Sequence, residues 1–231
     1  MIYVTSDTYG DMMRFRRCGV HLKKNDTVIV CGNFGFYCDK DRLAEKSLKW
    51  LGKQKFTVAF LHGAIDDITW LSSLPQIDWN GGKAVRTSEN VYWLPQGEIY
   101  EIEGKKLFCF GGGENLDYIG QGFDEEFYAS SLLSDEVKQR AKENLARYNN
   151  QVDFFLTHDA PSKLRTIMQQ RKNGKEMPCT AFHQFLDELW QENSFSGWYF
   201  GKYGEDHTIA PIYHCVFHAF IPLNPKGKRR K

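Results

Sequence analysis

The sequence lacks the features that mark membrane, secreted and strongly charged proteins. No apolar run approaches the roughly 20 residues that a membrane-spanning helix needs, and the first residues lack the basic region and long apolar stretch of a signal peptide. The 231 residues carry a formal net charge of +1, which gives no general attraction to nucleic acid or to anionic lipid. We therefore expect a cytoplasmic protein without membrane or nucleic-acid partners.

Paired cysteines and several catalytic motifs are also missing. The six cysteines contain no CxxC pair, and three of them, Cys31, Cys109 and Cys215, stand inside apolar runs typical of strands. Free cysteine behaves there as a small apolar residue, so we predict reduced, buried thiols. The chain has no nucleophile elbow, P-loop or zinc-deaminase signature. Residues 111–113 are three glycines after a strand-like run, but no GxGxxG pattern opens a helix there.

The composition is that of a protein with a large core. Hydrophobic residues make up 42% of the chain and aromatic residues 15%, and a chain of this length commonly forms one domain. The last six residues, 226–231, carry five positive charges. We predict a single domain over residues 1–223 and a basic tail, solvated as such runs usually are, over residues 224–231.

Short β-branched and aromatic runs recur along the chain, and most end in Gly, Asp, Asn or Pro, as strands do. They predict strands over residues 1–5, 27–31, 56–61, 91–94, 99–102, 106–110, 153–157, 197–200 and 213–221. Helical spacing of apolar residues predicts helices over residues 14–22, 39–53, 134–149 and 180–192, and Asp66 and Asp67 precede a further helix from Ile68. This alternation predicts an α/β sandwich of sheet layers flanked by helices.

Several of these strands end in polar or glycine-rich loops. The loops lie at residues 6–11, 32–35, 62–67, 157–161 and 201–207. In α/β sheets, sites are built at the carboxyl ends of strands, where loops bring distant residues together.

The order and spacing of these loops resemble the calcineurin-like metallophosphoesterase family, in a bacterial or phage-type branch. The family pattern runs DxH, GD, GNH, a lone His and GHxH. The segments MIYVTSDTYGDMMRF, VIVCGNFGFYCD, GGGENLDY, VDFFLTHDAP and WYFGKYGED carry the likeness over nearly the whole chain. The resemblance implies a four-layer α/β/β/α sandwich with two divalent metals that activate water and hold phosphate oxygens.

The resemblance also implies which residues would hold the metals, and most of these positions are substituted. Asp7 and His158 match the family, whereas Asn33 replaces the bridging aspartate and keeps an oxygen donor without the charge. The remaining ligand positions are occupied by Tyr9, Ala64, Lys202 and Gly204, and Ile65 occupies the position of the family's catalytic histidine.

Lys202 is the most informative substitution, because an ammonium group repels a dication. We expect it to replace a metal charge by pairing with Asp7 or Asn33. The alternative is that the loop has changed its conformation and that the Lys202 side chain points to solvent.

Nearby residues leave a one-metal site open. His62, Asp66, Asp67, Asp11, Asp159 and His207 flank the altered motifs, and one of them could join Asp7, Asn33 and His158 around one ion. We expect Asp66 and Asp67 to cap the following helix instead. His214 and His218 are expected to be ordinary sheet histidines, because four residues along a strand separate them by about 13 Å.

Three functions follow from this pattern. The first is a degenerate metallophosphoesterase, or pseudophosphatase, that binds a protein or a phosphate-containing small ligand and needs no metal. The second is a metal-dependent phosphatase or phosphodiesterase with one metal or repositioned ligands, using Mn, Zn, Fe or Ni. The third is regulatory binding of an anion by Lys202. Because the loss of one group near a metal weakens binding or activity by about 10- to 100-fold, four losses favour the first function.

Overall fold

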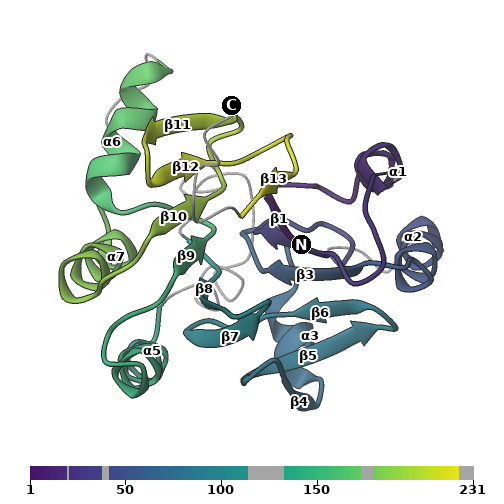
Figure 1. The fold of residues 1–231 in the computed structure, drawn as a ribbon, viewed down its shortest axis with the longest axis horizontal. Coiled ribbons are helices and arrows are strands. Elements are labelled where there is room, and N and C mark those ends of the chain that lie inside the picture. Colours follow the sequence, from purple (N-terminus) through teal and green to yellow (C-terminus); the bar gives the residue numbers. More distant parts are fainter. Residues whose placement is uncertain (20, 38–41, 114–132, 173–178, 224–231) are drawn as a thin grey trace.

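The computed structural model describes residues 1–19, 21–37, 42–113, 133–172 and 179–223. The predicted basic tail, the start of the predicted helix at residues 39–41 and most of the GGGENLDY segment lie outside these residues. Within them, the chain forms a mixed α/β fold with two mixed sheets and six helices (Figure 1). None of these helices combines the length and the apolar character needed to cross a bilayer.

The first sheet has seven strands in the order β13-β1-β2-β3-β6-β5-β4. Strands β1, β2, β3 and β6 are parallel; β13 is antiparallel to β1, β5 is antiparallel to β6, and β4 is antiparallel to β5. The strands are β1 Ile2–Thr5, β2 Thr27–Cys31, β3 Thr57–Leu61, β4 Gln76–Trp79, β5 Gly82–Ser88, β6 Val91–Trp93 and β13 Ile221–Pro222.

The second sheet has six strands in the order β11-β12-β10-β9-β8-β7. Strands β12, β10, β9 and β8 are parallel, and the two edge strands are antiparallel to their neighbours. The strands are β7 Glu98–Ile102, β8 Lys105–Phe110, β9 Phe154–Thr157, β10 Gly197–Phe200, β11 His207–Ala210 and β12 Tyr213–Cys215.

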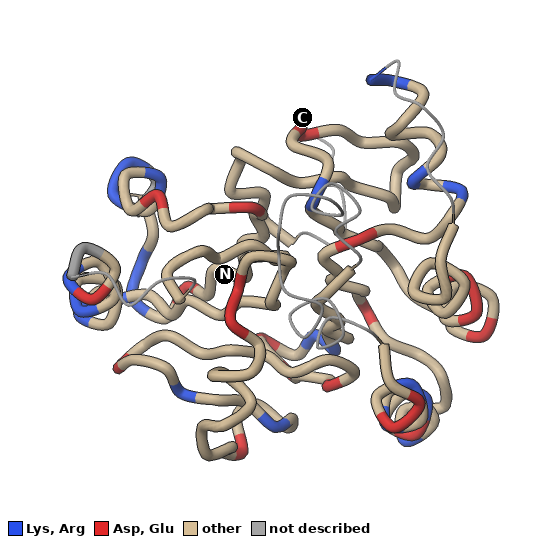
Figure 2. Tube along the Cα trace, turned by 180° about the vertical axis from the view of Figure 1, so that it is seen from behind, with Lys and Arg blue, Asp and Glu red and all other residues tan. Residues whose placement is uncertain are grey.

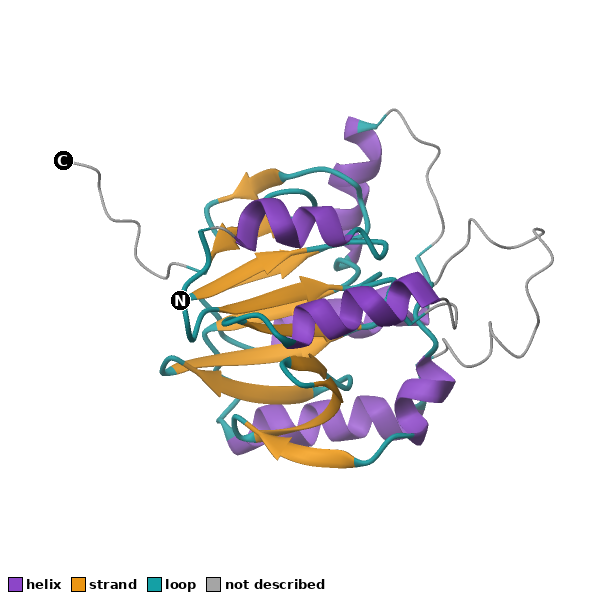
Figure 3. Cartoon of the chain, turned by 90° about the vertical axis from the view of Figure 1, so that its right-hand side faces the viewer, coloured by secondary structure: helices purple, strands orange, loops and turns teal. Residues whose placement is uncertain are grey.

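Three apolar clusters show how the sheets and helices pack. One lies between the sheets, where Val4 and Ile29 face Leu107 and Leu156. A second cluster packs the first sheet against α1 Met12–Gly19, α2 Arg42–Gly52 and α3 Ile68–Ser73. A third joins the second sheet to α5 Asp135–Arg147, α6 Ser162–Arg171 and α7 Ala181–Glu192. Central strands are therefore buried on both faces, which explains their continuous apolar runs. Figure 3 views the protein from the side of α1 and α2.

Local signals in the sequence account for several elements. Ser134 caps α5 by accepting a hydrogen bond from the amide of Val137, and Asp67 caps α3 through the amide of Trp70. The predicted apolar side of α7 is buried, and the thiols of Cys31, Cys109 and Cys215 are free and buried as predicted. Three strands, β4, β5 and β11, and helix α6 were not predicted.

The predicted strand over residues 213–221 is wrong, because the chain crosses there from the second sheet to the first. Strand β12 ends at Cys215, and β13 pairs with β1. Between them, the Asp206 carboxylate accepts hydrogen bonds from the amides of Phe217, His218 and Ala219 at 2.7, 3.0 and 2.9 Å. These amides are therefore not used in a ladder, and His218 lies outside any strand, contrary to its description as a sheet histidine.

Candidate functional site

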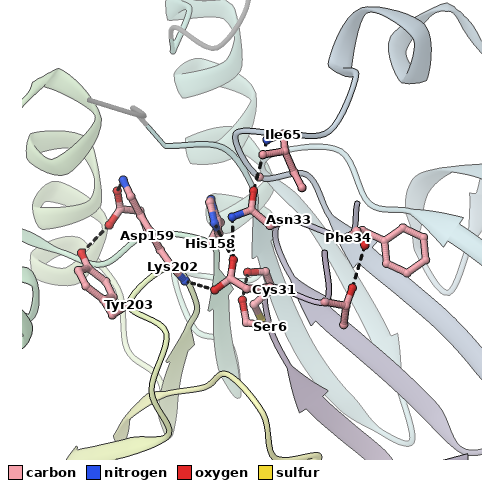
Figure 4. A network of polar contacts seen from close by, with 12 residues as sticks. Ser6, Cys31, Asn33, Phe34, Ile65, His158, Asp159, Lys202 and Tyr203 are labelled. Atoms are coloured by element: carbon pink, nitrogen blue, oxygen red, sulfur yellow. Dashed lines mark hydrogen bonds and ion pairs between the residues drawn. The ribbon is translucent and has the colours of Figure 1, made fainter. Parts of the chain in front are cut away.

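The candidate site lies where the carboxyl ends of parallel strands from both sheets meet. Asp7 follows β1 and Asn33 follows β2 in the first sheet, and His158 follows β9 and Lys202 follows β10 in the second. The structure brings Asn33, His158 and Lys202 around the Asp7 carboxylate (Figure 4). Residues up to 195 positions apart in the sequence thus form one cluster.

Asp7 is the centre of the cluster, and both of its carboxylate oxygens accept hydrogen bonds. Oδ1 accepts from the side-chain nitrogen of Asn33 at 2.8 Å, and Oδ2 accepts from the backbone amide of Lys202 at 2.7 Å. The Nε2 atom of His158 lies 3.4 Å from Oδ1. Asp7 is only 1% exposed, so these protein groups replace water as partners of a buried carboxylate.

Asn33 acts as a donor toward Asp7 and not as an oxygen ligand beside it. Its Oδ1 accepts a hydrogen bond from the amide of Ile65 at 3.3 Å, while its Nδ2 faces Asp7. This orientation follows from the two partners, one of which is an N–H group and the other a carboxylate. In this arrangement the Asn33 oxygen therefore faces the Ile65 amide and not Asp7.

His158 is fixed from one side through its Nδ1 atom. Its Nδ1 lies 3.1 Å from the carbonyl oxygen of Gly112, which can only accept, so Nδ1 carries a proton. Its Nε2 makes no hydrogen bond with the described residues, although the side chain is only 1% exposed. A side chain at Gly32 would overlap the His158 ring, since its Cβ would lie 2.1 Å from Cδ2. Glycine at position 32 therefore lets the two sheets approach here.

The Lys202 side chain pairs with Asp159 and not with Asp7 or Asn33. Its Nζ lies 2.5 Å from Oδ2 of Asp159, and the side chain is 24% exposed. The expected partner was wrong because the backbone amide of Lys202, and not the ammonium, reaches Asp7. The ammonium then extends to the next buried carboxylate. The alternative of a lysine turned wholly to solvent is also wrong.

Asp159, which is itself fully buried, is the hub of a second polar cluster. Besides Lys202, it accepts hydrogen bonds from the Tyr203 hydroxyl at 2.6 Å, the Ala160 amide at 2.8 Å and the His183 ring at 3.2 Å. Burial alone would raise the pKa of Asp159, but the Lys202 ammonium and the His183 hydrogen bond outweigh it and hold this pKa well below its usual range. Asp159 is thus a carboxylate at neutral pH.

The His183 tautomer follows from its partners. The backbone amide of Thr180 donates to Nδ1 at 3.2 Å, so Nδ1 carries no proton and Nε2 donates to Asp159. His183 is therefore neutral, and Lys202 supplies the positive charge beside Asp159. Sequence reasoning missed His183 and Tyr203 as site residues. Tyr203 adjoins Lys202 in a loop of interest, but nothing in the sequence marks His183 apart from other helical residues.

Four residues of the altered motifs share a strained backbone conformation. Asp7, Tyr9, Asn33 and Lys202 have φ values of 46°, 48°, 45° and 73°. Residues other than glycine adopt this left-handed region at a cost of about 1–2 kcal/mol each. Among the described residues, the other non-glycine positions with positive φ are Asn25, Asn80, Glu103, Asn149 and Asn150; four of these five are asparagines, which tolerate the conformation well, as Asn33 and Asp7 also do, so the cost falls mainly on Tyr9 and Lys202. The loops thus keep a demanding geometry at the positions where the family pattern places ligands.

The side chains at three of the four remaining family positions have no donor or acceptor atom. Ala64 and Ile65 have apolar side chains, Gly204 has none, and Tyr9 is 57% exposed.

The flanking residues mostly serve the fold. Asp66 accepts hydrogen bonds from the amides of Phe34, Gly35 and Gly63, and burial raises its pKa. It therefore ties two loops together, and only Asp67 of the expected pair caps α3. Asp11 accepts a hydrogen bond from the amide of Met13 at the start of α1.

The histidines of the flanking set have separate positions. His62 is buried beside Trp93, and burial together with nearby His158 lowers its pKa to about 3. His207 opens strand β11, and His214 stacks on Tyr199 within the second sheet.

The donor set does not fit two metals. Asp7 already accepts two N–H groups, Asn33 turns its oxygen away, and the Lys202 ammonium lies on the carboxylate next to His158. Among the residues that the structure describes, no group of three or more His, Cys, Asp or Glu side chains is placed to hold a metal ion. One pair of donors does suit a single ion: bonds of about 2.1 Å at tetrahedral angles separate two ligand atoms by about 3.4 Å, the spacing of His158 Nε2 and Asp7 Oδ1.

Comparison with known proteins leaves the family open. The sequence matches no family model and no curated protein. Among solved structures, it is similar to the protein of unknown function AQ665 from Aquifex aeolicus, with 14% identity, 70% of this chain and 81% of that chain covered, and a TM-score of 0.35. A likeness at this level carries no conclusion about function, so the family assignment rests on the motifs alone.

Proposed function

We propose that the protein is a degenerate calcineurin-like metallophosphoesterase, built on that family's four-layer α/β/β/α sandwich. In this proposal it has lost two-metal hydrolysis and binds a protein or a phosphate-containing small ligand through the loops at the strand ends. The observation that carries the proposal is the state of Asp7: both oxygens of this surviving ligand accept N–H groups, from Asn33 and from Lys202. The family chemistry needs those oxygens for metal.

The charge pattern of the cluster supports the same function. Two neighbouring metals require anionic and lone-pair donors to offset their repulsion. Here an ammonium group pairs with Asp159 beside His158, so a positive charge already stands among these loops. The partly exposed Lys202 and the exposed Tyr9 provide a cation and an aromatic ring at the same loops, which suits recognition of an anionic ligand.

The strained backbone supports a retained function for these loops. Left-handed residues persist where surrounding structure holds them, and they concentrate at functional sites. A loop without function would gain stability by losing such residues. Four of them remain at Asp7, Tyr9, Asn33 and Lys202, which supports continued use of the site after its metals were lost.

A direct experiment measures metal content and hydrolysis in the same preparation. Protein purified without chelators is analysed for Mn, Fe, Ni and Zn, and hydrolysis of an aryl phosphate and an aryl phosphodiester is followed with excess Mn²⁺. We expect well under 0.1 metal ion per chain and no turnover above the rate of an Asp7→Ala, His158→Ala double variant. Near-stoichiometric metal with turnover that this variant abolishes would reject the proposal.

The ligand half of the proposal has its own test. Inorganic phosphate and a nucleoside monophosphate are titrated into the protein by calorimetry, with Lys202→Met and Tyr9→Ala as variants. Binding weakened at least 10-fold by either substitution supports recognition at these loops. Equal binding by all three proteins would place the anion elsewhere and contradict this part.

The second candidate is a phosphoesterase with one metal, and the unused His158 Nε2 favours it. This buried nitrogen has no hydrogen-bond partner in the described part of the chain and lies 3.4 Å from Asp7 Oδ1. In that case Asp7 and His158 hold the ion, which would polarise a phosphate oxygen. One equivalent of metal, lost in His158→Ala but kept in His62→Asn, would select this candidate.

A further inference from the structure

One side of the protein, formed by α1, α2 and the turns after them, carries a concentrated positive charge. Among residues 12–25 and 44–56, eight exposed side chains are basic and one, Glu45, is acidic. Figure 2 shows the Lys and Arg positions gathered on these two helices, whereas α7 across the molecule carries carboxylates only. We call this surface the basic face; its cations are Arg16, Arg17, Lys23, Lys24, Lys46, Lys49, Lys53 and Lys55.

Contacts between the elements join these charges into one surface. The Arg16 guanidinium lies over the Trp50 ring of α2 at 5.3 Å from its centroid. At the ends of the helices, the amide of Asn25 donates to the carbonyl of Lys55 at 3.3 Å, which brings the two turns together. Along the chain, Lys46, Lys49 and Lys53 follow at intervals of three and four residues, so they share one side of α2 and its end.

The charges of the basic face are not neutralised by the part of the chain that the structure describes. None of its eight cations forms an ion pair with the residues that the structure describes, whereas Lys142 of α5 pairs with Glu188 and Glu192. Cations in the last turn of a helix stabilise its negative end, and Arg16, Arg17 and Lys49 have that position. Lys23, Lys24 and Lys55 lie in turns, so this effect does not explain them.

We propose that the basic face binds the phosphodiester backbone of double-stranded DNA. A surplus of seven positive charges on one side, in a protein of net charge +1, matches a partner with regularly spaced negative charges. The proposal replaces the expectation, drawn from net charge, that nucleic acid is not a partner. It is independent of the Asp7 cluster and of the function proposed for it.

The composition of the face separates this partner from others. A membrane-binding surface places several large apolar side chains beside its cations, whereas among the described residues between 12 and 56 only one such side chain, Met13 of α1, is exposed, at 46%. Single-stranded nucleic acid is bound by stacking on exposed aromatic rings, and Trp50 is half-buried under Arg16. Protein interfaces are poor in lysine, whereas six of the eight cations are lysines. A duplex backbone fits best.

The test measures binding of a fluorescein-labelled 24-base-pair DNA duplex by anisotropy at several NaCl concentrations. The wild-type protein is compared with the triple variant Lys46→Glu, Lys49→Glu, Lys53→Glu. We expect the triple variant to bind at least 10-fold more weakly at 50 mM NaCl. The slope of log K against log salt should fall in magnitude by about 2–3, since each phosphate contact contributes about 0.9.

A matched control has the same charge change on other surfaces: Lys83→Glu, Lys163→Glu, Lys172→Glu, at three exposed lysines outside the basic face. It should keep at least half of the wild-type affinity, and circular dichroism should show both variants folded. Equal weakening of both triple variants, or no binding by the wild-type protein at 50 mM NaCl, would overturn the proposal. Binding to phosphatidylserine vesicles without binding to the duplex would also overturn it.

Discussion

At the scale of single residues, two buried carboxylates are satisfied in different ways. Asp7 relies on the N–H donors of Asn33 and Lys202, whereas Asp159 has an ammonium group of its own. A buried carboxylate without such partners is costly. Lys202 contacts both carboxylates: its backbone amide donates to Asp7 and its ammonium group pairs with Asp159. Every residue type except proline has the backbone amide, so a substitution of Lys202 keeps the bond to Asp7 and removes the cation beside Asp159.

Lys202→Met tests the ammonium alone. It keeps the length of the side chain and the amide, but it leaves Asp159 buried without a cation. Removal of one partner of a buried ion pair costs about 3–5 kcal/mol, and the partial exposure of Lys202 reduces this, so we expect a loss of about 2 kcal/mol in the free energy of unfolding. Denaturant unfolding at pH 7 measures it. Lys172→Met, at an exposed lysine, is the control and should change stability by less than 0.5 kcal/mol; an equal loss would contradict the assigned role.

Asp159 also predicts a pH dependence. Its pKa in the folded protein lies well below its value in the unfolded chain, so the unfolded chain takes up the proton first as pH falls. The stabilisation is complete above the unfolded pKa of about 3.9 and is lost as pH falls through the folded pKa. We expect Lys202→Met to approach wild-type stability below pH 4. A difference that stays constant down to pH 3 would show that the ion pair is not its source.

His62 predicts a different pH window. Burial lowers its pKa to about 3 in the folded protein, against about 6.5 in the unfolded chain. The unfolded chain therefore binds a proton below pH 6.5 and the folded protein does not, so stability falls with pH over that window. Between pH 7 and 5 we expect a loss of about 2 kcal/mol from this residue. His62→Asn, which can accept from Trp93 in place of Nδ1, should remove this part of the slope; an unchanged slope would contradict it.

At the scale of elements, adjacent aspartates have unrelated tasks. Asp66 joins the loops after β2 and β3 by accepting from three amides, whereas Asp67 caps α3. Sequence patterns recognise the second task because the cap and its helix are local. The first task depends on a loop about 30 residues away, so the sequence suggested a cap for both.

The pair Asp66→Asn and Asp67→Asn separates these tasks. Asparagine caps helices as well as aspartate does, so Asp67→Asn should change the free energy of unfolding by less than 0.5 kcal/mol. At Asp66 an NH₂ group would face amide donors, and we expect a loss of about 2–3 kcal/mol. Thermal unfolding of both variants measures the difference. Equal effects would show that Asp66 does not hold the loops together.

At the scale of the whole molecule, the chain returns to its beginning. Strand β13 pairs with β1, and the carbonyl of Phe217 accepts hydrogen bonds from Thr5 and Arg14. The Asp7 loop thus rests on a segment that comes after the second sheet. The site depends on both sheets and on the closing segment, because Asp7 belongs to one sheet and Lys202 to the other.

Shortening the chain tests this dependence. A chain of residues 1–215 lacks one acceptor of Arg14, the Phe217 carbonyl, and the pairing of β13, and we expect a melting temperature at least 10 °C below that of a chain of residues 1–223. In the full chain, Arg14→Met removes the guanidinium donor and keeps the Phe217 carbonyl. Arg14→Met should lose at least 1 kcal/mol; full stability in both the short chain and Arg14→Met would contradict the closing role.

The sequence by itself determined the central strands, most helices, the free thiols and the meeting of strand-end loops. These follow from local periodicity, from caps such as Ser134 and Asp67, and from the rule that parallel strands end at one edge. Only the tertiary structure decided the partners. Lys202 pairs with Asp159, the amide nitrogen of Asn33 faces Asp7, and His183 of α7 contacts Asp159. Each of these contacts depends on the distance between segments that are remote in the chain. The missed strands β4, β5 and β11 and the break after Cys215 have the same cause: sheet pairing and side-chain contacts with distant residues outweigh local propensity.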